Sequence, residues 1–269
     1  MEVAMGTQAQ KLAGKKSQKK GMKFEIKFAS HIGGKKQKGQ LMDIWGEIHT
    51  EPKTDVIGPD EELYSVKNSP GSTQIQVCSV KRFSRKFDVP QLVEDYLIRF
   101  CGAHEEVMAE LPYNRQLFLE ALRKRGINAS KLSDEEIRRN RESGHSIEGF
   151  EEVVFPWIKA NIGKITRFIL QESFVSLQEA QAFPNKLVWN TGDSNPANCE
   201  IFDIDEIVRR METMDMFVGF GTSAATSVRF GPFTFQMKGS KAEKENTSKS
   251  FHNMQFKCSL KNLKKYLKL

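Results

Sequence analysis

One β-hairpin signal, inside the stretch Glu51–Gln76, constrains the fold more than any other part of the chain. Thr54–Ile57 is short and β-prone, and Gly58-Pro59-Asp60 is a turn signal. Leu63–Lys67 then alternates between two faces with the period of a strand. The pattern therefore predicts two antiparallel strands joined by a tight turn.

The register of this hairpin brings charged side chains together. If the turn closes over Gly58–Glu61, Asp55 lies opposite Ser65, and Lys67 follows one step further on the same face. An acid and a lysine placed in this way fit a metal-dependent phosphodiesterase site, where the acid holds a divalent cation and the lysine orients or activates water. The other interpretations are a turn aspartate and, if the strand lies at an edge, a solvated lysine.

The same residues resemble a known signature. Pro52-Lys53-Thr54-Asp55 followed by Ser65-Val66-Lys67 is similar to the PD-(D/E)xK nuclease motif, in the variant of some type II restriction endonucleases that replaces the middle carboxylate with a small polar residue. Three later segments resemble the MspI-like group of these enzymes: Asp203-Ile204-Asp205-Glu206, Gly219-Phe220-Gly221-Thr222 and Met254-Gln255-Phe256-Lys257.

The resemblance implies a fold and an activity. The fold would be α/β, restriction-endonuclease-like, with a central mixed β-sheet flanked by helices and a helical insertion. The activity would be Mg²⁺-dependent hydrolysis of phosphodiester bonds in double-stranded DNA at a short specific sequence, with Asp55 as metal ligand and Lys67 positioning water. Ser65 stands where the family usually has an acid, so the site has one hard ligand fewer for Mg²⁺. The number of metal ions, and whether the site is active, therefore stay open.

Two further side chains are candidates to complete the site. Gln40–His49 has apolar residues at helical spacing. In nucleases of this resemblance an acid on the helix before the core often faces the metal, which makes Glu47 a candidate second metal ligand. Gln76 belongs to a third strand predicted at Thr73–Phe83 and would line the site beside Lys67. An exposed helix glutamate and a strand-surface amide are the alternatives.

DNA contacts are predicted in three places. The loop Asn68–Thr73 offers backbone N–H groups to a phosphate, although a simple hairpin turn explains it equally well. A basic cluster follows the third strand. In the C-terminal third, lysine can donate to guanine and glutamine can pair with adenine, unless these lysines only bind phosphates. The candidate contacts are Ser69, Ser72, Lys81, Arg82, Gln236, Lys238, Ser240, Lys241 and Gln255.

The charge distribution also favours a polyanionic partner. Residues 1–38 hold ten lysines and two glutamates, a net charge of +8, and residues 235–269 hold nine lysines and two glutamates, a net charge of +7. Because the whole chain carries +7, the middle is acidic. Lysine-rich ends suit DNA, since each phosphate contact releases counterions. A solvated, solubilising surface is the alternative.

Bulk properties set the class of protein. The 269 residues suffice for one large domain or two small ones, and no apolar run approaches the length of a transmembrane helix. Four widely spaced cysteines indicate neither zinc nor disulfides, so a reducing cytoplasm is expected. The protein is expected to be a monomer or a homodimer. The predicted organisation is a disordered basic tail (1–21) and one nuclease domain (22–269), divided into a catalytic core (22–100), a helical insertion (101–180) and a C-terminal DNA-reading region (185–269).

Other elements follow from periodicity. Met22–Ala29 alternates and predicts a half-buried strand. Further strands are predicted at Leu187–Asn190, Ile201–Ile204, Ser227–Met237 and His252–Ser259, and helices after Val89, within Phe155–Leu177, at Glu206–Thr213 and at Lys261–Leu269.

Two alternative functions remain compatible with the sequence. A structure-specific repair or phage-type nuclease would use the same catalytic core on branched or damaged DNA. A catalytically decayed DNA-binding protein would keep the basic ends and lose the chemistry, and Ser65 in the usual acid position keeps this alternative open.

Overall fold

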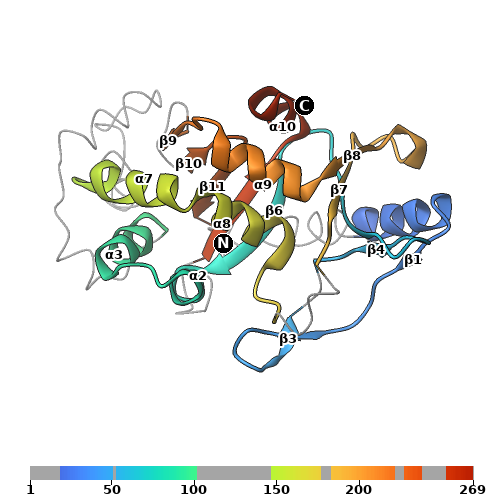
Figure 1. Cartoon of the computed structure of the whole chain (residues 1–269), viewed down its shortest axis with the longest axis horizontal. Helices are drawn as coiled ribbons and strands as arrows, with labels where there is room; N and C mark the ends of the chain where they lie inside the picture. Colours follow the sequence, from blue (N-terminus) through green and yellow to red (C-terminus); the bar gives the residue numbers. More distant parts are fainter. Residues whose placement is uncertain are drawn as a thin grey trace, which may run out of the picture. The chain divides into compact units, whose positions relative to one another are not determined.

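The computed structural model describes residues 19–50, 53–101, 147–176, 183–221, 227–237 and 253–268. These residues form two compact units, each with a five-stranded sheet (Figure 1). The first unit takes the described parts of Met1–Thr73, Gly163–Met214 and Ser259–Leu269, and the second takes those of Gln74–Ile162 and Asp215–Cys258. The mixed α/β class is confirmed. The predicted domain divisions stay a prediction, and most of the predicted helical insertion lies outside the described residues.

The first unit is built on a mixed sheet in the order β1-β4-β5-β7-β8. Its strands are β1 (Lys35–Lys36), β4 (Val56–Ile57), β5 (Leu63–Asn68), β7 (Lys186–Asn190) and β8 (Glu200–Asp203). β5 and β7 are parallel and the other neighbours are antiparallel. β5 is therefore an interior strand, flanked by β4 and β7.

The hairpin of β4 and β5 forms as predicted. Val56 pairs with Tyr64, and the turn closes with the Gly58 N–H donating to the Glu62 carbonyl at 2.8 Å. The next step of this register places Asp55 opposite Ser65. The hairpin is local in sequence and its turn residues specify the geometry, which is why the pattern predicted it.

The N-terminal element of this unit differs from the prediction. Residues 19–31 are helical, so a strand at Met22–Ala29 is wrong. A strand would place Phe24, Ile26 and Phe28 on one face, whereas the helix buries Phe24 and Phe28 and leaves Ile26 54% exposed. The two rings are four residues apart, which fits one helical face as well as one strand face. The segment 19–31 holds four lysines, one glutamate, one methionine and one alanine, all residue types that favour a helix.

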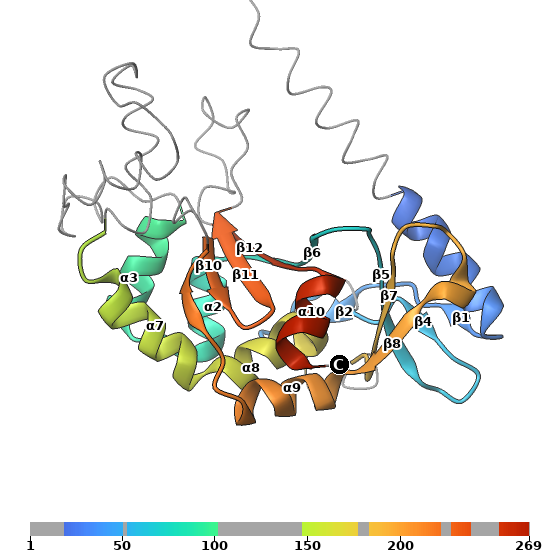
Figure 2. The same cartoon turned by 90° about the horizontal axis from the view of Figure 1, so that it is seen from above.

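This N-terminal helix (residues 19–31) packs on the central strands. Phe24 and Phe28 share a buried cluster with Val56 of β4, Val66 of β5 and Val188 of β7. The Phe28 ring also meets Tyr64 edge-on, with ring centroids 5.5 Å apart. Figure 2 shows the helix in blue beside β1 and β4. The helix thus covers the face of the sheet onto which Val56, Tyr64 and Val66 point.

Two substitutions test this correction. Phe28→Ala is expected to lower the free energy of unfolding by about 3–5 kcal/mol, because the ring is fully buried. Ile26→Ala is expected to change it by no more than about 0.5 kcal/mol, because the side chain is half exposed in the helix. Urea unfolding of both variants provides the measurement. Equal losses would support the strand instead.

A helix at Gln40–His49 is also wrong. The chain forms two short antiparallel strands there, β2 (Leu41–Met42) and β3 (Ile48–Thr50). Asp43 is 1% exposed, and its Oδ1 accepts the N–H groups of Trp45 at 2.9 Å and Glu47 at 3.0 Å. Gly46 has a φ of 84°, which L-residues rarely adopt. The aspartate and the glycine therefore form a turn in the middle of the apolar pattern.

The second unit carries an antiparallel sheet in the order β6-β12-β11-β10-β9. Its strands are β6 (Thr73–Ser79), β9 (Val218–Phe220), β10 (Ser227–Phe230), β11 (Phe233–Met237) and β12 (Asn253–Cys258), and its helices are α2 (Val80–Phe87), α3 (Gln91–Phe100) and α7 (Phe150–Ala160). The predicted third strand ends at Ser79, whose hydroxyl accepts the Arg82 N–H and caps α2.

Aromatic side chains hold this second unit together. α3 and α7 lie side by side (Figure 2) and pack on one face of the sheet. Phe150 of α7 contacts Phe100 of α3 and Phe220 of β9, with centroids 5.1 and 5.5 Å apart. Phe100 also meets Phe235 of β11 at 5.7 Å. Strand alternation therefore turns aromatic residues toward the helices and polar residues to the opposite face.

The remaining elements agree well with the sequence. The predicted strands at Leu187–Asn190, Ile201–Ile204 and His252–Ser259 are present, and Ser227–Met237 forms two strands joined at Gly231-Pro232. The first unit also contains α8 (Ile162–Arg167), a π-helical turn (Phe168–Glu172), α9 (Ile204–Thr213) and α10 (Leu260–Leu267). Within the described ranges, no helix combines the length and apolar character needed to cross a membrane.

Candidate active site

The carboxylate of Asp55 is the centre of the candidate site. Its Oδ2 accepts the Val66 backbone N–H at 2.6 Å. The same oxygen lies 3.4 Å from Ser65 Oγ and 3.5 Å from Lys67 Nζ. Three donors of β5 thus converge on one oxygen, while no described residue donates to Oδ1. The structure brings together three of the five predicted catalytic residues, which are Asp55, Ser65 and Lys67.

The surroundings of this cluster are partly shielded from water. Ser65 is 2% exposed, and the side chains of Lys67 and Asp55 are 17% and 24% exposed. Because β5 is an interior strand, Lys67 is not the solvated edge-strand lysine of the alternative interpretation. Both charged side chains therefore keep part of their surface in contact with solvent. The interior strand and the 2.6 Å hydrogen bond from the Val66 N–H fix the orientation of the carboxylate.

The side chains around Asp55 suit a Mg²⁺ ion that is bound together with a phosphate. Among the described residues, no group of three or more His, Cys, Asp or Glu side chains is placed to hold a metal ion. Mg²⁺ in phosphoryl-transfer sites often uses only one or two carboxylates, with substrate phosphate and waters completing its shell. Asp55 Oδ1 and the Ser65 hydroxyl are oxygen donors of the required kind. The residues therefore fit a metal bound jointly with a phosphate better than one caged by protein.

Glu47 is not on a helix. It lies exposed in the β2–β3 turn, where its backbone N–H is bonded to Asp43. The helix that precedes the core strands is at residues 19–31, and its acid is Glu25, whose side chain is 17% exposed and ion-paired with Lys36. Lys36 pairs in register with Val56, so the Glu25–Lys36 pair lies on the face of the sheet opposite to the one that carries Asp55. With residues 22–29 predicted as a strand, Glu25 was not predicted to lie on the helix before the core. The four-residue spacing of Phe24 and Phe28 was the signal for that helix.

Gln76 lies in the sheet of the second unit. β6, which carries it, pairs with β12, whereas β5 pairs with β4 and β7. The register places Leu187 next to Ser65 and Trp189 next to Lys67. The strand that lies beside the catalytic candidates is therefore β7, more than a hundred residues away in sequence. A role for Gln76 beside Lys67 stays a prediction.

Two loops meet at the carboxyl ends of the parallel strands β5 and β7. In the first loop, the Ser69 N–H donates to the Asn190 carbonyl at 2.9 Å, and the indole N–H of Trp189 donates to the Ser69 carbonyl at 3.0 Å. Ser69 Oγ accepts the Gly71 N–H at 3.3 Å, and Ser72 is exposed. Carboxyl ends of parallel strands are frequent ligand sites, and Lys67 lies one residue before the end of β5.

The second loop, residues 190–199, is built around the fully buried Asn190. Its amide donates to Asp193 Oδ1 and to the Asn195 carbonyl, both at 2.9 Å, and accepts the Gly192 N–H at 2.7 Å. Hydrogen bonds from Asn198, Asn195 and Asn190 lower the pKa of Asp193. Gly192 has a φ of 95°, and a Cβ there would lie 3.0 Å from Pro70. The loop is therefore held firmly against the first one.

Apart from Ser69 and Ser72, the predicted DNA contacts lie in the second unit or outside the described ranges. Lys81 and Arg82 are on α2. Gln236 pairs in register with Gln255, whose amide donates to Gln74 Oε1 at 2.7 Å. Strand alternation puts these amides on the polar face of the second sheet. Lys238, Ser240 and Lys241 lie outside the described residues.

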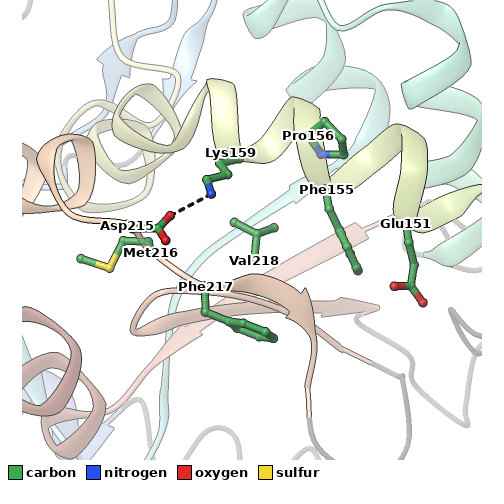
Figure 3. Close-up of a pocket in the computed structure, with 8 residues that line it drawn as sticks. All are labelled: Glu151, Phe155, Pro156, Lys159, Asp215, Met216, Phe217 and Val218. Carbon is green, nitrogen blue, oxygen red and sulfur yellow. Dashed lines mark hydrogen bonds and ion pairs between the residues drawn. The ribbon is translucent and has the colours of Figure 1, made fainter.

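A separate concavity lies between α7 and β9 in the second unit (Figure 3). It has a volume of about 580 Å³. An ion pair between Lys159 and Asp215, 2.8 Å long, stands at its side, and it lowers the pKa of Asp215. Phe155 and Phe217 supply apolar walls. None of the predicted catalytic residues lines it, and the two carboxylates in its lining, Glu151 and Asp215, do not suit a phosphodiester.

Comparisons with known proteins add one structural likeness. No family model matches the chain, and no curated protein matches it. The solved structure of restriction endonuclease MspI in complex with its cognate DNA is similar, with a TM-score of 0.39 and 11% sequence identity, over 83% of this chain and 69% of that chain. Values this low do not establish the function of this chain.

Proposed function

We propose that the protein is a type II restriction endonuclease that hydrolyses phosphodiester bonds of double-stranded DNA at a short specific sequence, with Mg²⁺ as cofactor. One observation carries the proposal, the convergence of Ser65, Lys67 and the Val66 N–H on the Asp55 carboxylate. A buried hydroxyl, a partly buried ammonium and a carboxylate with one open oxygen form a site suited to a metal and a phosphate.

Each residue has a distinct role in the proposed reaction. Asp55 would hold the cation through Oδ1, while the Val66 N–H fixes the orientation of the carboxylate through Oδ2. Bound Mg²⁺ would supply Lewis acidity toward the scissile phosphate and lower the pKa of attacking water. Lys67 would orient the water and stabilise the charge that builds on the phosphate oxygens as the phosphorus–oxygen bond to the leaving strand breaks. Ser65 would donate a hydrogen bond to the carboxylate or to a water beside it.

The other parts of the proposal concern the substrate and setting. The Gln236–Gln255 pair on the polar face of the second sheet is of the residue type that reads adenine, which supports sequence recognition. The lysine-rich ends support binding to duplex DNA. We further propose that the protein acts in the cytoplasm, as a monomer or homodimer.

Incubation of the full chain with plasmid DNA, with and without Mg²⁺, tests the proposal. Discrete fragments that require Mg²⁺, with ends that map to one short sequence, are the expected result, and EDTA should abolish them. Cleavage only of branched or damaged DNA would favour the structure-specific nuclease. Duplex binding without any cleavage would favour the decayed DNA-binding protein, which Ser65 in the usual acid position suggests.

A further inference from the structure

The exposed side of the N-terminal helix carries a line of cations. Lys19, Lys23 and Lys27 are all exposed and follow one another at i, i+4 spacing. With a rise of 1.5 Å per residue, their Cα atoms lie about 6 Å apart along the axis, so the line spans about 12 Å. We call these three residues the lysine stripe. It forms a regular row of positive charge on a rigid element.

The packing of the helix fixes the direction of this stripe. Phe24 and Phe28 are buried in the first unit, and the stripe lies on the opposite side of the helix. The one acid of the helix, Glu25, is turned toward Lys36 and paired with it. No carboxylate of the helix therefore neutralises the stripe.

The helix is also tied to the candidate active site within the same unit. Its buried rings pack on Val56 and Val66, the sequence neighbours of Asp55 and Lys67, whose own side chains point to the opposite face of the sheet. At its N-terminal end, Lys20 Nζ lies 3.4 Å from the carbonyl oxygen of Gly192, in the loop that packs on Pro70. The start of the stripe thus lies at the end of the sheet where the two loops and Lys67 are found.

We propose that the lysine stripe binds backbone phosphates of duplex DNA on one side of the scissile bond. This inference rests on the proposed function and extends it to the surface that holds the substrate. Lysines on flexible stems bind phosphates without reading sequence, so the stripe would position the duplex, while base recognition lies elsewhere. The nearby Asp193 carboxylate accepts hydrogen bonds from Asn190, Asn195 and Asn198, which fix its orientation within its own loop.

An anionic membrane is the competing partner. Met22 and Ile26 are 47% and 54% exposed and lie beside the stripe, as in helices that bind membrane surfaces. Two apolar side chains would bury little area in a membrane. The hydrogen bond from Lys20 to Gly192, which links the helix to the loops near Lys67, would not contribute to membrane binding. The observations therefore favour DNA.

Salt-dependent duplex binding is the decisive experiment. The full chain and the triple variant K19Q/K23Q/K27Q would bind a labelled duplex in EDTA over a range of KCl concentrations. The slope of log affinity against log salt is expected to fall in magnitude by about 0.9 for each lost phosphate contact, or about 2.7 in total. The matched control is K159Q/K164Q/R209Q, which removes three exposed cations on α7, α8 and α9, outside the two lysine-rich ends of the chain.

Each outcome decides the proposal. The proposal is supported if the slope changes by about 2.7 in K19Q/K23Q/K27Q and by less than one in the control. Circular dichroism should be unchanged in both variants. Equal slope changes in both variants would overturn it, because net charge alone would then explain the effect. An unchanged slope in K19Q/K23Q/K27Q, or loss of binding to phosphatidylserine vesicles without loss of duplex binding, would also overturn it.

Cleavage assays separate this inference from the proposed function. At low salt, K19Q/K23Q/K27Q should keep Mg²⁺-dependent cleavage with a raised KM and an unchanged kcat, because the stripe does not contact the reacting atoms. The wild-type chain could cut no DNA while the salt slope of duplex binding still falls as expected in K19Q/K23Q/K27Q. In that case the proposed catalysis is wrong and the duplex-binding surface is supported.

Discussion

Asp55→Asn is expected to reduce Mg²⁺-dependent plasmid cleavage by about 10²–10⁴-fold while leaving duplex affinity within about threefold of wild type. The asparagine has the shape of aspartate and still offers an oxygen to the Val66 N–H, which lies 2.6 Å from the native carboxylate. What it removes is the negative charge that would hold the cation. Single-turnover cleavage and gel-shift binding on the same duplex provide the two measurements.

Lys67→Gln is expected to produce a loss of similar size, because Lys67 Nζ lies 3.5 Å from the same carboxylate oxygen. The double variant should lose little more than the more damaged single variant, since groups that act as one unit are not additive. Lys164→Gln, which removes an exposed lysine of α8 in the same unit, is the matched control and should cut at the wild-type rate. Wild-type cleavage by both Asp55→Asn and Lys67→Gln would refute the assignment of the site.

The sequence predicted this pair because the information is local. A turn signal and a strand of period two set the register, and the register decides which side chains meet. Asp55, Ser65 and Lys67 lie within a span of 13 residues, so no distant contact is needed to bring them together. The strand and helix signals of the C-terminal third were also local, and Asp203 caps α9 as such patterns predict.

Prediction failed where two periods or two distant segments competed. Phe24 and Phe28 satisfy both the helical and the strand spacing, and only the burial of the whole element shows that Ile26 points away from the core. The turn at Asp43 and Gly46 interrupts a convincing helical pattern. As a result, Glu47 was predicted on a helix, and Glu25, which does lie on a helix, was predicted on a strand.

The neighbour of β5 illustrates the second kind of failure. The sequence placed Thr73–Phe83 beside the site because it comes next along the chain. The structure instead pairs β5 with β7, where Lys67 lies next to Trp189. Parallel pairing over such a separation depends on the packing of the whole unit and leaves no local pattern. Gln76 therefore had no reliable placement from sequence.

Ser65→Asp is expected to make the fold depend on metal. Ser65 is 2% exposed and its hydroxyl is 3.4 Å from Asp55 Oδ2, so the new carboxylate would face an existing one at close range. Without Mg²⁺, the uncompensated charge should lower the free energy of unfolding by about 3 kcal/mol at pH 7, with partial relief from Lys67. With Mg²⁺, both carboxylates become ligands, and a concentration about 100 times the Kd would restore about 2.7 kcal/mol.

The pH dependence of unfolding is a second, independent test of the destabilisation expected in Ser65→Asp. Repulsion between the two carboxylates raises the folded-state pKa of one of them above its value in the unfolded chain, about 3.9. The folded state of the variant is therefore penalised at neutral pH, and its deficit relative to wild type should shrink as the pH falls through the raised pKa. Thermal unfolding from pH 4.5 to 8, with EDTA or Mg²⁺, measures both effects. Ser65→Ala is the control and should respond weakly to either. If Mg²⁺ stabilises Ser65→Asp no more than Ser65→Ala, these side chains do not form a metal site.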